Sequence, residues 1–265
     1  MNLKRVLTII DKEWAEVFKN RMVIFTISFM PVIFTILPLV MLYALGSGGG
    51  LPAGDTADVP PEFLVSCGNL PGADCMQIFL MNQFMIMFMM MPLVIPTAIA
   101  SYSIVGEKTT RSLEPLLATP VTTVELLSGK ALAAALPAVV ITWVCFLIFI
   151  VLMPVAGATP GLIQHVTGPV WVIAVLVMGP LMAIAAVNLA VIVSSRVNDP
   201  RVAEQIAGVL VIPMIALLFG QLAGIIVLNL ALIFISILVV FVIDVILVYA
   251  GAHLFQRETI LTRWK

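Results

Sequence analysis

Long apolar stretches alternate with short polar stretches along the chain, and the polar stretches carry nearly all of the charges. A helix needs about 20 predominantly apolar residues to cross the hydrocarbon core of a membrane. Six stretches approach or exceed this length, approximately at residues 23–45, 78–105, 131–154, 170–193, 205–222 and 228–251. They predict an all-α polytopic membrane protein in which residues 1–265 form a single transmembrane domain.

The boundary between the fifth and sixth stretches has the weakest signals. Gly220, Gln221, Gly224 and Asn229 are the turn-forming residues there, and no charged residue marks the exit from the membrane. Two full spans fit this region. A pair of partial helices that enter from the outside is the alternative.

The Lys and Arg residues predict the orientation of these spans. Lys and Arg close to the ends of spans stay on the cytoplasmic side, so we expect both termini in the cytoplasm. Residues 46–77, 155–169 and roughly 220–229 carry no Lys or Arg and are expected to be outside loops. All 13 basic residues fall into four stretches: Lys4, Arg5, Lys12, Lys19 and Arg21; Lys108, Arg111 and Lys130; Arg196 and Arg201; Arg257, Arg263 and Lys265.

Composition agrees with a chain that lies in the lipid bilayer. Hydrophobic residues make up 62% of the sequence and charged residues only 10%, whereas soluble domains average about 25% charged residues. The net charge of −1 averages a basic inside and an acidic outside and implies no nucleic-acid partner. An enzyme is disfavoured, because the spans hold no His/Glu zinc motif and no Ser/His or paired-Asp arrangement.

The first residues, about 2–20, predict an amphipathic helix that lies in the membrane interface. Charged residues occupy the rest of its circumference. An ordinary cytoplasmic lead-in that happens to be amphipathic is the alternative. The apolar residues at helical spacing are Leu3, Val6, Leu7, Ile10, Trp14, Val17 and Phe18.

The polar segment between the second and third spans, Gly106 to Lys130, is longer than a simple connection requires. Glu107 and Arg111 have the favourable i, i+4 order, which predicts that the second helix continues beyond the bilayer. Pro115 ends that helix and can begin another, because proline is tolerated at the first helical position. Pro120 then stops it, which predicts a short helix between two prolines.

This short helix would present the apolar pair Leu116 and Leu117 to the cytoplasm. Exposed apolar residues favour a docking site for a soluble partner. Packing of the pair onto the bundle itself or onto the lipid surface is the alternative. Beyond it, Thr122 and Glu125 have the spacing of a capping box and predict the start of the third span's helix.

The segment resembles the cytoplasmic loop of type-2 ABC transporter permeases. The likeness rests on the pattern Glu-x-x-x-Arg-x-Leu-Glu-x-Leu-Leu-x-Thr-Pro from Glu107, on the later Glu-Leu-Leu-x-Gly-Lys that ends at Lys130, and on six spans after an amphipathic helix. It implies an exporter subunit of the cell membrane that pairs with a second permease, either another copy or a paralogue. Ser112 stands where many relatives have glycine, and it is expected to stiffen the junction.

The resemblance also implies separate cytoplasmic ABC ATPase subunits, which bind ATP and Mg²⁺. The chain itself has no Gly-rich Walker loop, so we expect no bound cofactor and no ATP hydrolysis on it. The short helix, Leu113 to Pro120, would couple ATP hydrolysis to opening of the bundle. Glu107, Arg111 and Glu114 would contact the ATPase or brace the N-terminal helix. The coupling residues are Glu107, Arg111, Leu113, Glu114, Pro115, Leu116, Leu117 and Pro120.

Polar residues inside spans mark a transport pathway by default, because each is costly when it faces lipid. The candidates are Asn82, Gln83, Asn188 and Asp244. Asp244 is the ionisable residue deepest in a span; it could bind a cation, carry a proton, or stay protonated and hydrogen-bond a neighbouring helix. For Asn188 a hydrogen bond that holds two helices together is the expectation.

The cargo stays open between a sodium ion, an amphipathic drug and a lipid-like molecule. Two other functions fit the residues: an ion-coupled secondary carrier that uses Asp244, and a non-transporting membrane assembly factor. The carrier would work without ATP and would fail on Asp244→Asn.

The sulfur-containing residues suggest one covalent link and no metal site. Cys67 and Cys75 share the first outside loop and could form a disulfide in an oxidising exterior. Met81, Met85 and Met89 stack at i, i+4 in the second span. Thioethers can bind Cu(I), but without a His or Cys cluster nearby the expectation is an adaptable apolar surface.

Overall fold

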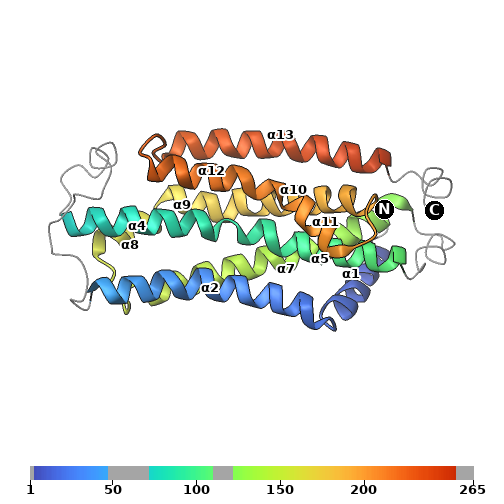
Figure 1. Ribbon diagram of the computed structural model, residues 1–265, viewed down its shortest axis with the longest axis horizontal. Coiled ribbons are helices and arrows are strands. Elements are labelled where there is room, and N and C mark those ends of the chain that lie inside the picture. The colour runs from blue at the N-terminus through green and yellow to red at the C-terminus, as the bar shows by residue number, and fades with distance from the viewer. Residues whose placement is uncertain (1–2, 47–71, 110–121, 255–265) are drawn as a thin grey trace.

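The computed structural model describes residues 3–46, 72–109 and 122–254. Within these ranges the chain is helical and has no strand. Six helical segments are long and apolar enough to cross a membrane, which confirms the predicted all-α membrane fold. They run side by side along the long axis of the molecule (Figure 1).

The six segments divide into single helices and interrupted ones. Helix α1, Leu3–Val17, precedes them. The first, third and sixth are single helices: α2 (Arg21–Gly46), α7 (Thr123–Leu152) and α13 (Leu230–Leu254). The second consists of α4 (Gly72–Phe88) and α5 (Met91–Thr109). The fourth consists of α8 (Pro160–Val166), α9 (Pro169–Ile173), η1 (Ala174–Met178) and α10 (Gly179–Ser194), and the fifth of α11 (Pro200–Ala207), η2 (Gly208–Leu210) and α12 (Val211–Leu222).

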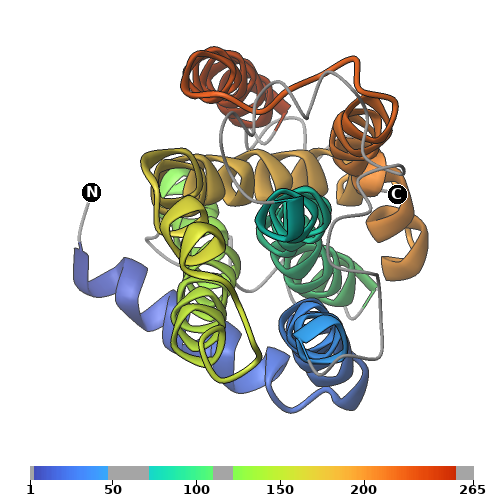
Figure 2. The same ribbon diagram turned by 90° about the vertical axis from the view of Figure 1, so that its left-hand side faces the viewer.

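The second segment forms the centre of the bundle, and the sixth lies at its edge. In the end-on view α4 is surrounded by other helices, whereas α13 stands apart (Figure 2). In the most apolar 18-residue stretch of the second segment 72% of the residues are buried, whereas in the corresponding stretch of α13 only 11% are buried. Most of the surface of α13 is therefore not covered by the described residues and is available to lipid or to another protein.

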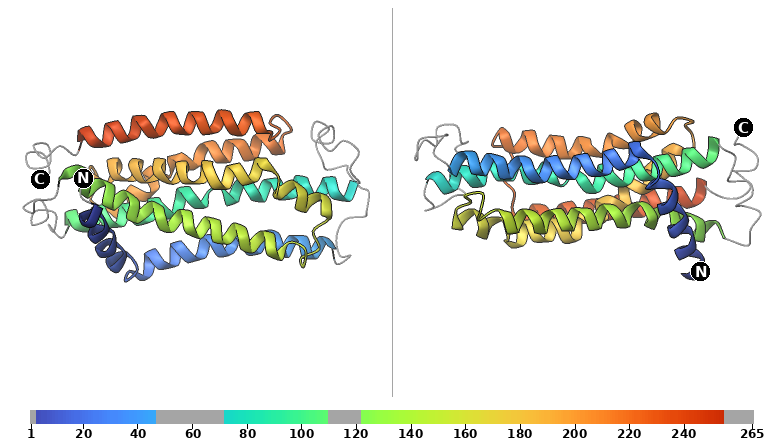
Figure 3. Two further views of the ribbon diagram at one scale, coloured as in Figure 1. Left: turned by 180° about the vertical axis from the view of Figure 1, so that it is seen from behind. Right: turned by 90° about the horizontal axis from the view of Figure 1, so that it is seen from below.

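The N-terminal helix does not run with the others. Helix α1 crosses one end of the bundle and packs against α7 and α5 (Figure 3). The end of α5, the start of α7 and the ends of α10 and α13 lie at this same end (Figure 1). We refer to it as the α1 end.

Proline explains the break in the central segment. An α-helical ladder through the break would require an N–H at residue 92 to donate to the carbonyl of Phe88, and Pro92 has none. Helix α4 accordingly ends at Phe88 and α5 begins at Met91. The residues Met81, Met85 and Met89 on this segment are at most 2% exposed and belong to the core.

A second irregularity lies in the fourth segment, where the π-helical turn η1 precedes Pro180. In π geometry each N–H donates to the carbonyl five residues back, as Gly179 does to Ala174. Pro180 has no N–H for the carbonyl of Val175, and the indole Nε1 of Trp143 on α7 donates to this oxygen instead, at 3.1 Å. A backbone carbonyl inside a span needs such a partner, so the contact stabilises the π-helical turn.

Of two connections, the first differs from what its sequence suggested, and the second turns at residues that the sequence indicated. Residues 155–169 were expected to be a loop, but they contain α8, because Thr159 accepts a hydrogen bond from the Leu162 N–H and Pro160 occupies the first turn. Between α12 and α13 the chain turns at Gly224, whose φ of 72° favours glycine. The Asn229 side chain then accepts from the Leu232 N–H at the start of α13.

Candidate coupling site at the α1 end

Helix α1 presents a buried face to the bundle. Val6, Ile10, Glu13 and Val17 recur at helical spacing and are at most 5% exposed. Val6 and Ile10 pack with Ala133 of α7. Leu3, Leu7 and Phe18, which the apolar pattern placed on the same face, remain exposed. The apolar surface of α1 is thus wider than its contact with the bundle.

A glycine on α7 allows α1 to approach closely. A Cβ atom at Gly129 would lie 2.8 Å from Cγ2 and 2.9 Å from Cβ of Ile9, well inside van der Waals contact. One helical turn further, the indole Nε1 of Trp14 donates to the backbone oxygen of Ala133 at 2.9 Å. Helix α1 therefore contacts the backbone of α7 as well as its side chains.

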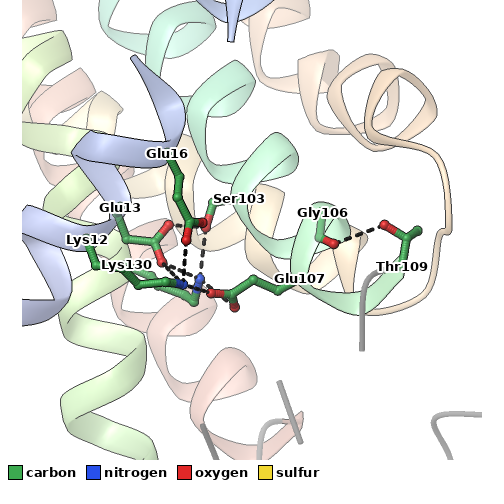
Figure 4. Close-up of polar contacts among 8 residues, drawn as sticks. All are labelled: Lys12, Glu13, Glu16, Ser103, Gly106, Glu107, Thr109 and Lys130. Atoms are coloured by element: carbon green, nitrogen blue, oxygen red, sulfur yellow. Dashed lines mark hydrogen bonds and ion pairs between the residues drawn. The ribbon is translucent and has the colours of Figure 1, made fainter. Parts of the chain in front are cut away.

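A cluster of charged side chains joins α1 to both α5 and α7 (Figure 4). The Lys130 ammonium lies 2.7 Å from Glu13 Oε1, 2.8 Å from Glu107 Oε2 and 2.9 Å from Ser103 Oγ. Glu13 and Ser103 accept hydrogen bonds from this ammonium, and Glu107 forms an ion pair with it. The Ser103 hydroxyl in turn donates to Glu13, so each side chain has a partner on another helix.

Lys12 completes this group, which we call the charged cluster: Lys12, Glu13, Ser103, Glu107 and Lys130. Its ammonium donates to Glu107. It also lies 3.6 Å from Glu13 Oε1. Glu13, Glu107 and Lys130 are only 2–6% exposed. Two ammonium and two carboxylate groups balance in charge, as buried ions require.

The pKa values of the two α1 members reflect these partners. Burial disfavours the Glu13 carboxylate, but the charge and hydrogen bond of Lys130, with help from Ser103 and Lys12, hold the pKa of Glu13 below its ordinary 4.5. Burial likewise disfavours the Lys12 ammonium. The hydrogen bond and charge of Glu107, together with the charges of Glu13 and Glu16, still raise the pKa of Lys12 above its ordinary 10.5. Both groups are ionised at neutral pH.

A second ionic contact reaches the first turn of α7. Thr122 and Glu125 form the predicted capping box, with Glu125 N–H donating to Thr122 Oγ1 at 3.2 Å and Thr122 N–H donating to Glu125 Oε2 at 3.0 Å. Arg5 of α1 lies 3.6 Å from the same Oε2 atom. Helix α1 is therefore also linked to the residues that directly follow segment 110–121.

Three of the four basic stretches meet at the α1 end. The charged cluster brings the first and second together, and Lys108 of α5 donates to the backbone oxygens of Ser195 and Val197, both at 3.2 Å. These oxygens lie at and beyond the C-terminus of α10, where a lysine is favourable. The contact also brings the third basic stretch, which begins at Arg196, to this end.

Of the predicted coupling residues, the structure describes Glu107. It is buried and contacts Lys12 and Lys130, so its side chain braces α1 and leaves little surface for a soluble protein. Arg111, Leu113, Glu114, Pro115, Leu116, Leu117 and Pro120 lie outside the described residues. The segment that contains them connects the end of α5 to the start of α7.

The predicted pathway residues do not come together around one space. The Asn82 side-chain oxygen lies 2.9 Å from Nε2 of His165 and accepts from the Trp171 indole at 3.2 Å, which ties α4 to α8 and α9. Asn188 was expected to form a hydrogen bond between two helices. The contact that the structure describes is instead a hydrogen bond to the backbone oxygen of Ile184 in its own helix. Asp244 and Gln83 are 5% and 8% exposed, and their side chains have no hydrogen-bond partner among the described residues.

A cavity of about 400 Å³ lies elsewhere, between α5 and the α11–α12 segment. Leu93, Val94 and Val211 give it an apolar wall, and Arg201 and Glu204 give it opposite charges. No predicted pathway residue lines it. Sequence reasoning missed it because its walls are more than 100 residues apart in the chain.

The disulfide between Cys67 and Cys75 stays a prediction. Cys75 is buried, at 2% exposure, near the start of α4 and is disulfide-bonded. Cys67 lies outside the described residues. Cys145 in α7 is a free thiol. Among the described residues no group of three or more His, Cys, Asp or Glu side chains could hold a metal ion.

The charged cluster was the main feature that the sequence did not reveal. A signal was present, because Glu13 stands at helical spacing with Val6, Ile10 and Val17 and so shares their buried face. A buried carboxylate requires a cation. Its partner Lys130 is 117 residues away, and nothing in the spacing identifies it.

Comparison with known proteins supports a single family over most of the chain. Residues 7–238 match the family model described as "ABC-2 family transporter protein". The match begins within α1 and ends within α13, so it includes every helix of the charged cluster. Comparison with curated protein sequences gives no match.

Proposed function

Because the chain belongs to the ABC-2 family of transporter proteins, we propose that it is the membrane-spanning subunit of an ATP-driven exporter whose ATPase is a separate protein. The structural observation that supports coupling is the charged cluster. Its salt bridges tie α1 to the end of α5 and the start of α7, the two helices that border segment 110–121. A push on that segment would move all three helices together.

The physical basis is that buried, fully paired charges resist separation. Parting Lys130 from Glu13 and Glu107 would leave ions uncompensated in a low-dielectric environment, which costs about 3–5 kcal/mol. Close packing of Ile9 on Gly129 adds a steric constraint. The α1 end is therefore suited to transmit a displacement from a docked ATPase to the spans.

The orientation follows from the basic residues. Lys12, Lys108 and Lys130 gather at the α1 end, where each donates hydrogen bonds to another helix or to the residues after one, and the positive-inside rule assigns such an end to the cytoplasm. The exposed apolar residues Leu3 and Leu7 would then let α1 rest in the membrane interface. Segment 110–121 would face the ATPase.

Among the cargoes that the sequence leaves open, the cavity between α5 and α11–α12 favours an amphipathic molecule. Leu93 and Val211 could contact its apolar part, and Arg201 and Glu204 its polar part. A bare sodium ion would instead require several converging oxygen ligands. A second copy or a paralogue would complete the pathway.

The test is co-purification from native membranes in mild detergent. An ATPase subunit should accompany the wild type in fixed stoichiometry and should be lost from Leu116→Asp/Leu117→Asp. The matched control, Leu116→Met/Leu117→Met, keeps the apolar surface and should retain the ATPase.

Wild-type protein without an ATPase would contradict the proposal. In that case ATP-independent ion flux should be measured for wild type and for Asp244→Asn. Flux that is lost in this variant would establish the ion-coupled carrier instead.

A further inference from the structure

A second cavity, of about 390 Å³, lies between α7, α10 and α13 near the α1 end. Its volume is within the range of about 300–1,000 Å³ that ligand sites occupy. Its lining is almost entirely apolar and includes Leu127, Ala131, Ala135, Val187, Val191 and Val248. It is separate from the cavity between α5 and α11–α12.

The arrangement of the helices explains this space. Helices α7 and α13 both pack on α10, and the small residues Ala131, Ala135 and Gly251 line the space between these three helices. A Cβ atom added at Gly251 would meet nothing within 4 Å. The side chains of the described residues therefore leave this volume unfilled.

The polar groups in the wall do not favour water or a charged ligand. Ser128 donates its hydroxyl to the Glu125 backbone oxygen at 3.2 Å, and Asn188 donates to the Ile184 oxygen at 2.9 Å. The described residues that line the cavity include no charged side chain. An ordered water molecule needs two to four polar partners, so an apolar occupant fits better.

The cavity continues into the surface that the spans present to the membrane. Val124, Leu132 and Val248 line it and are themselves 64%, 41% and 49% exposed. All three belong to candidate spans. The apolar material adjoining such a surface is the hydrocarbon of the bilayer, and an empty groove there would forfeit the dispersion contacts that a filled one gains.

We propose that the acyl chain of a bilayer phospholipid occupies the cavity between α7, α10 and α13. This chain would contact α7 on the face opposite to Gly129, Lys130 and Ala133, which face α1 and α5, because Ala131 and Ala135 point the other way around the helix. The lipid would thereby support the same turns of α7 that follow segment 110–121. The proposal does not depend on the identity of the ATPase or the cargo.

The test uses the full chain in vesicles of phosphatidylcholine and phosphatidylglycerol that contain a trace of phosphatidylcholine with a diazirine in one acyl chain. After irradiation, peptide mass spectrometry locates the adducts. We expect them to concentrate on residues 127–135 and 187–191. The reference is the exposed face of α2, at Val32 and Val40, where contact with lipid is transient.

Gly251→Leu should remove most adducts from both walls, because the new side chain takes the place of the lipid chain. Gly208→Leu is the matched control: its Cβ also meets nothing within 4 Å, but it lies in the other cavity, and the adducts should persist. Ala131→Leu, from the α7 wall, should reproduce the loss if Gly251→Leu does not fold.

Two results would overturn the proposal. One is that the α7 wall and the exposed face of α2 are labelled equally, and that neither Gly251→Leu nor Ala131→Leu changes this labelling. The other is an efficient disulfide between copies that carry Ala131→Cys, which would show that a second copy of the chain fills the cavity.

Discussion

The charged cluster at the α1 end and the polar residues within the spans solve the burial of polar groups in different ways. In the cluster, Lys130 has three partners on two other helices. Asp244 is as deeply buried as Lys130, yet neither of its oxygens has a hydrogen-bond partner among the described residues. Buried charge is thus matched at one end of the bundle and a polar group is left isolated within it.

The charged cluster is expected to be rigid, whereas the role of the isolated polar residues within the spans depends on other molecules. The cluster holds three helices in one arrangement, and its removal should be costly. Asp244 and Gln83 hold nothing together within the described chain, so their substitution should alter stability little. Predictions on the two regions should therefore differ in size.

The largest effect is expected for Lys130→Met. The substitution leaves the buried carboxylates of Glu13 and Glu107 with Lys12 as the one remaining cation of the cluster, which should reduce stability by about 3–5 kcal/mol. Thermal unfolding of the purified protein in detergent measures the change. Lys19→Met, at an exposed position after α1, is the control and should have little effect.

A double variant tests whether the loss comes from unpaired charge. Glu13→Gln combined with Lys130→Met leaves Glu107 with Lys12 as its cation, so the pair should be less destabilised than the sum of the single variants, by about 0.5–3 kcal/mol. Simple additivity would show that Glu13 and Lys130 do not interact.

The next largest effect is expected for Gly129→Ala. The added methyl group would lie 2.8 Å from Ile9 Cγ2, and overpacking of this kind costs about 1–3 kcal/mol. The same unfolding assay measures it. Adding Ile9→Ala should restore most of the stability, and a failure to do so would show that the contact between α1 and α7 is not the cause.

Asp244→Asn tests the polar residues within the spans, for comparison with the charged cluster. It removes no described hydrogen bond, and we expect a smaller change in unfolding temperature than for Gly129→Ala. The measurement should be made with and without the ATPase complex. A loss as large as that of Lys130→Met would show that Asp244 has a partner that stabilises the fold.

The smallest effect is expected from pH within a broad window. The pKa of Glu13 is lowered, so its contribution is complete above pH 4.5 and is lost only as pH falls through the lower folded value. The pKa of Lys12 is raised, so its contribution is complete below pH 10.5 and is lost at higher pH. Between these limits the docking of α1 should not change, as protease accessibility of α1 can measure. A transition near neutral pH would contradict this account.

The sequence predicted what depends on local pattern. Apolar stretches of sufficient length located the six segments, and the spacing of Thr122 and Glu125 predicted the cap of α7, which the structure confirms. The apolar stretch of the third span starts near residue 131, but helix α7 already begins at Thr123, because the capping box stabilises the start of the helix there.

What the sequence did not predict depends on distant contacts. Lys12 and Glu107 are 95 residues apart, and no periodicity connects them. The π-helical turn before Pro180 could not be foreseen either, since it is stabilised by Trp143 on another helix. The pathway role of the polar residues within spans stays a prediction; the structure shows that Asn82 links helices and that Asn188 bonds within its own helix.

We expect α1 and α7 to move as one body when the ATPase binds ATP. Spin labels at Ala15→Cys and Val140→Cys, both exposed positions, would report their distance in the complex with the co-purified ATPase, in a background with Cys145→Ala. The account predicts one narrow distance distribution, unchanged by ATP in the wild-type cluster and broadened in Lys130→Met. A distance that changes with ATP while the cluster is intact would contradict it.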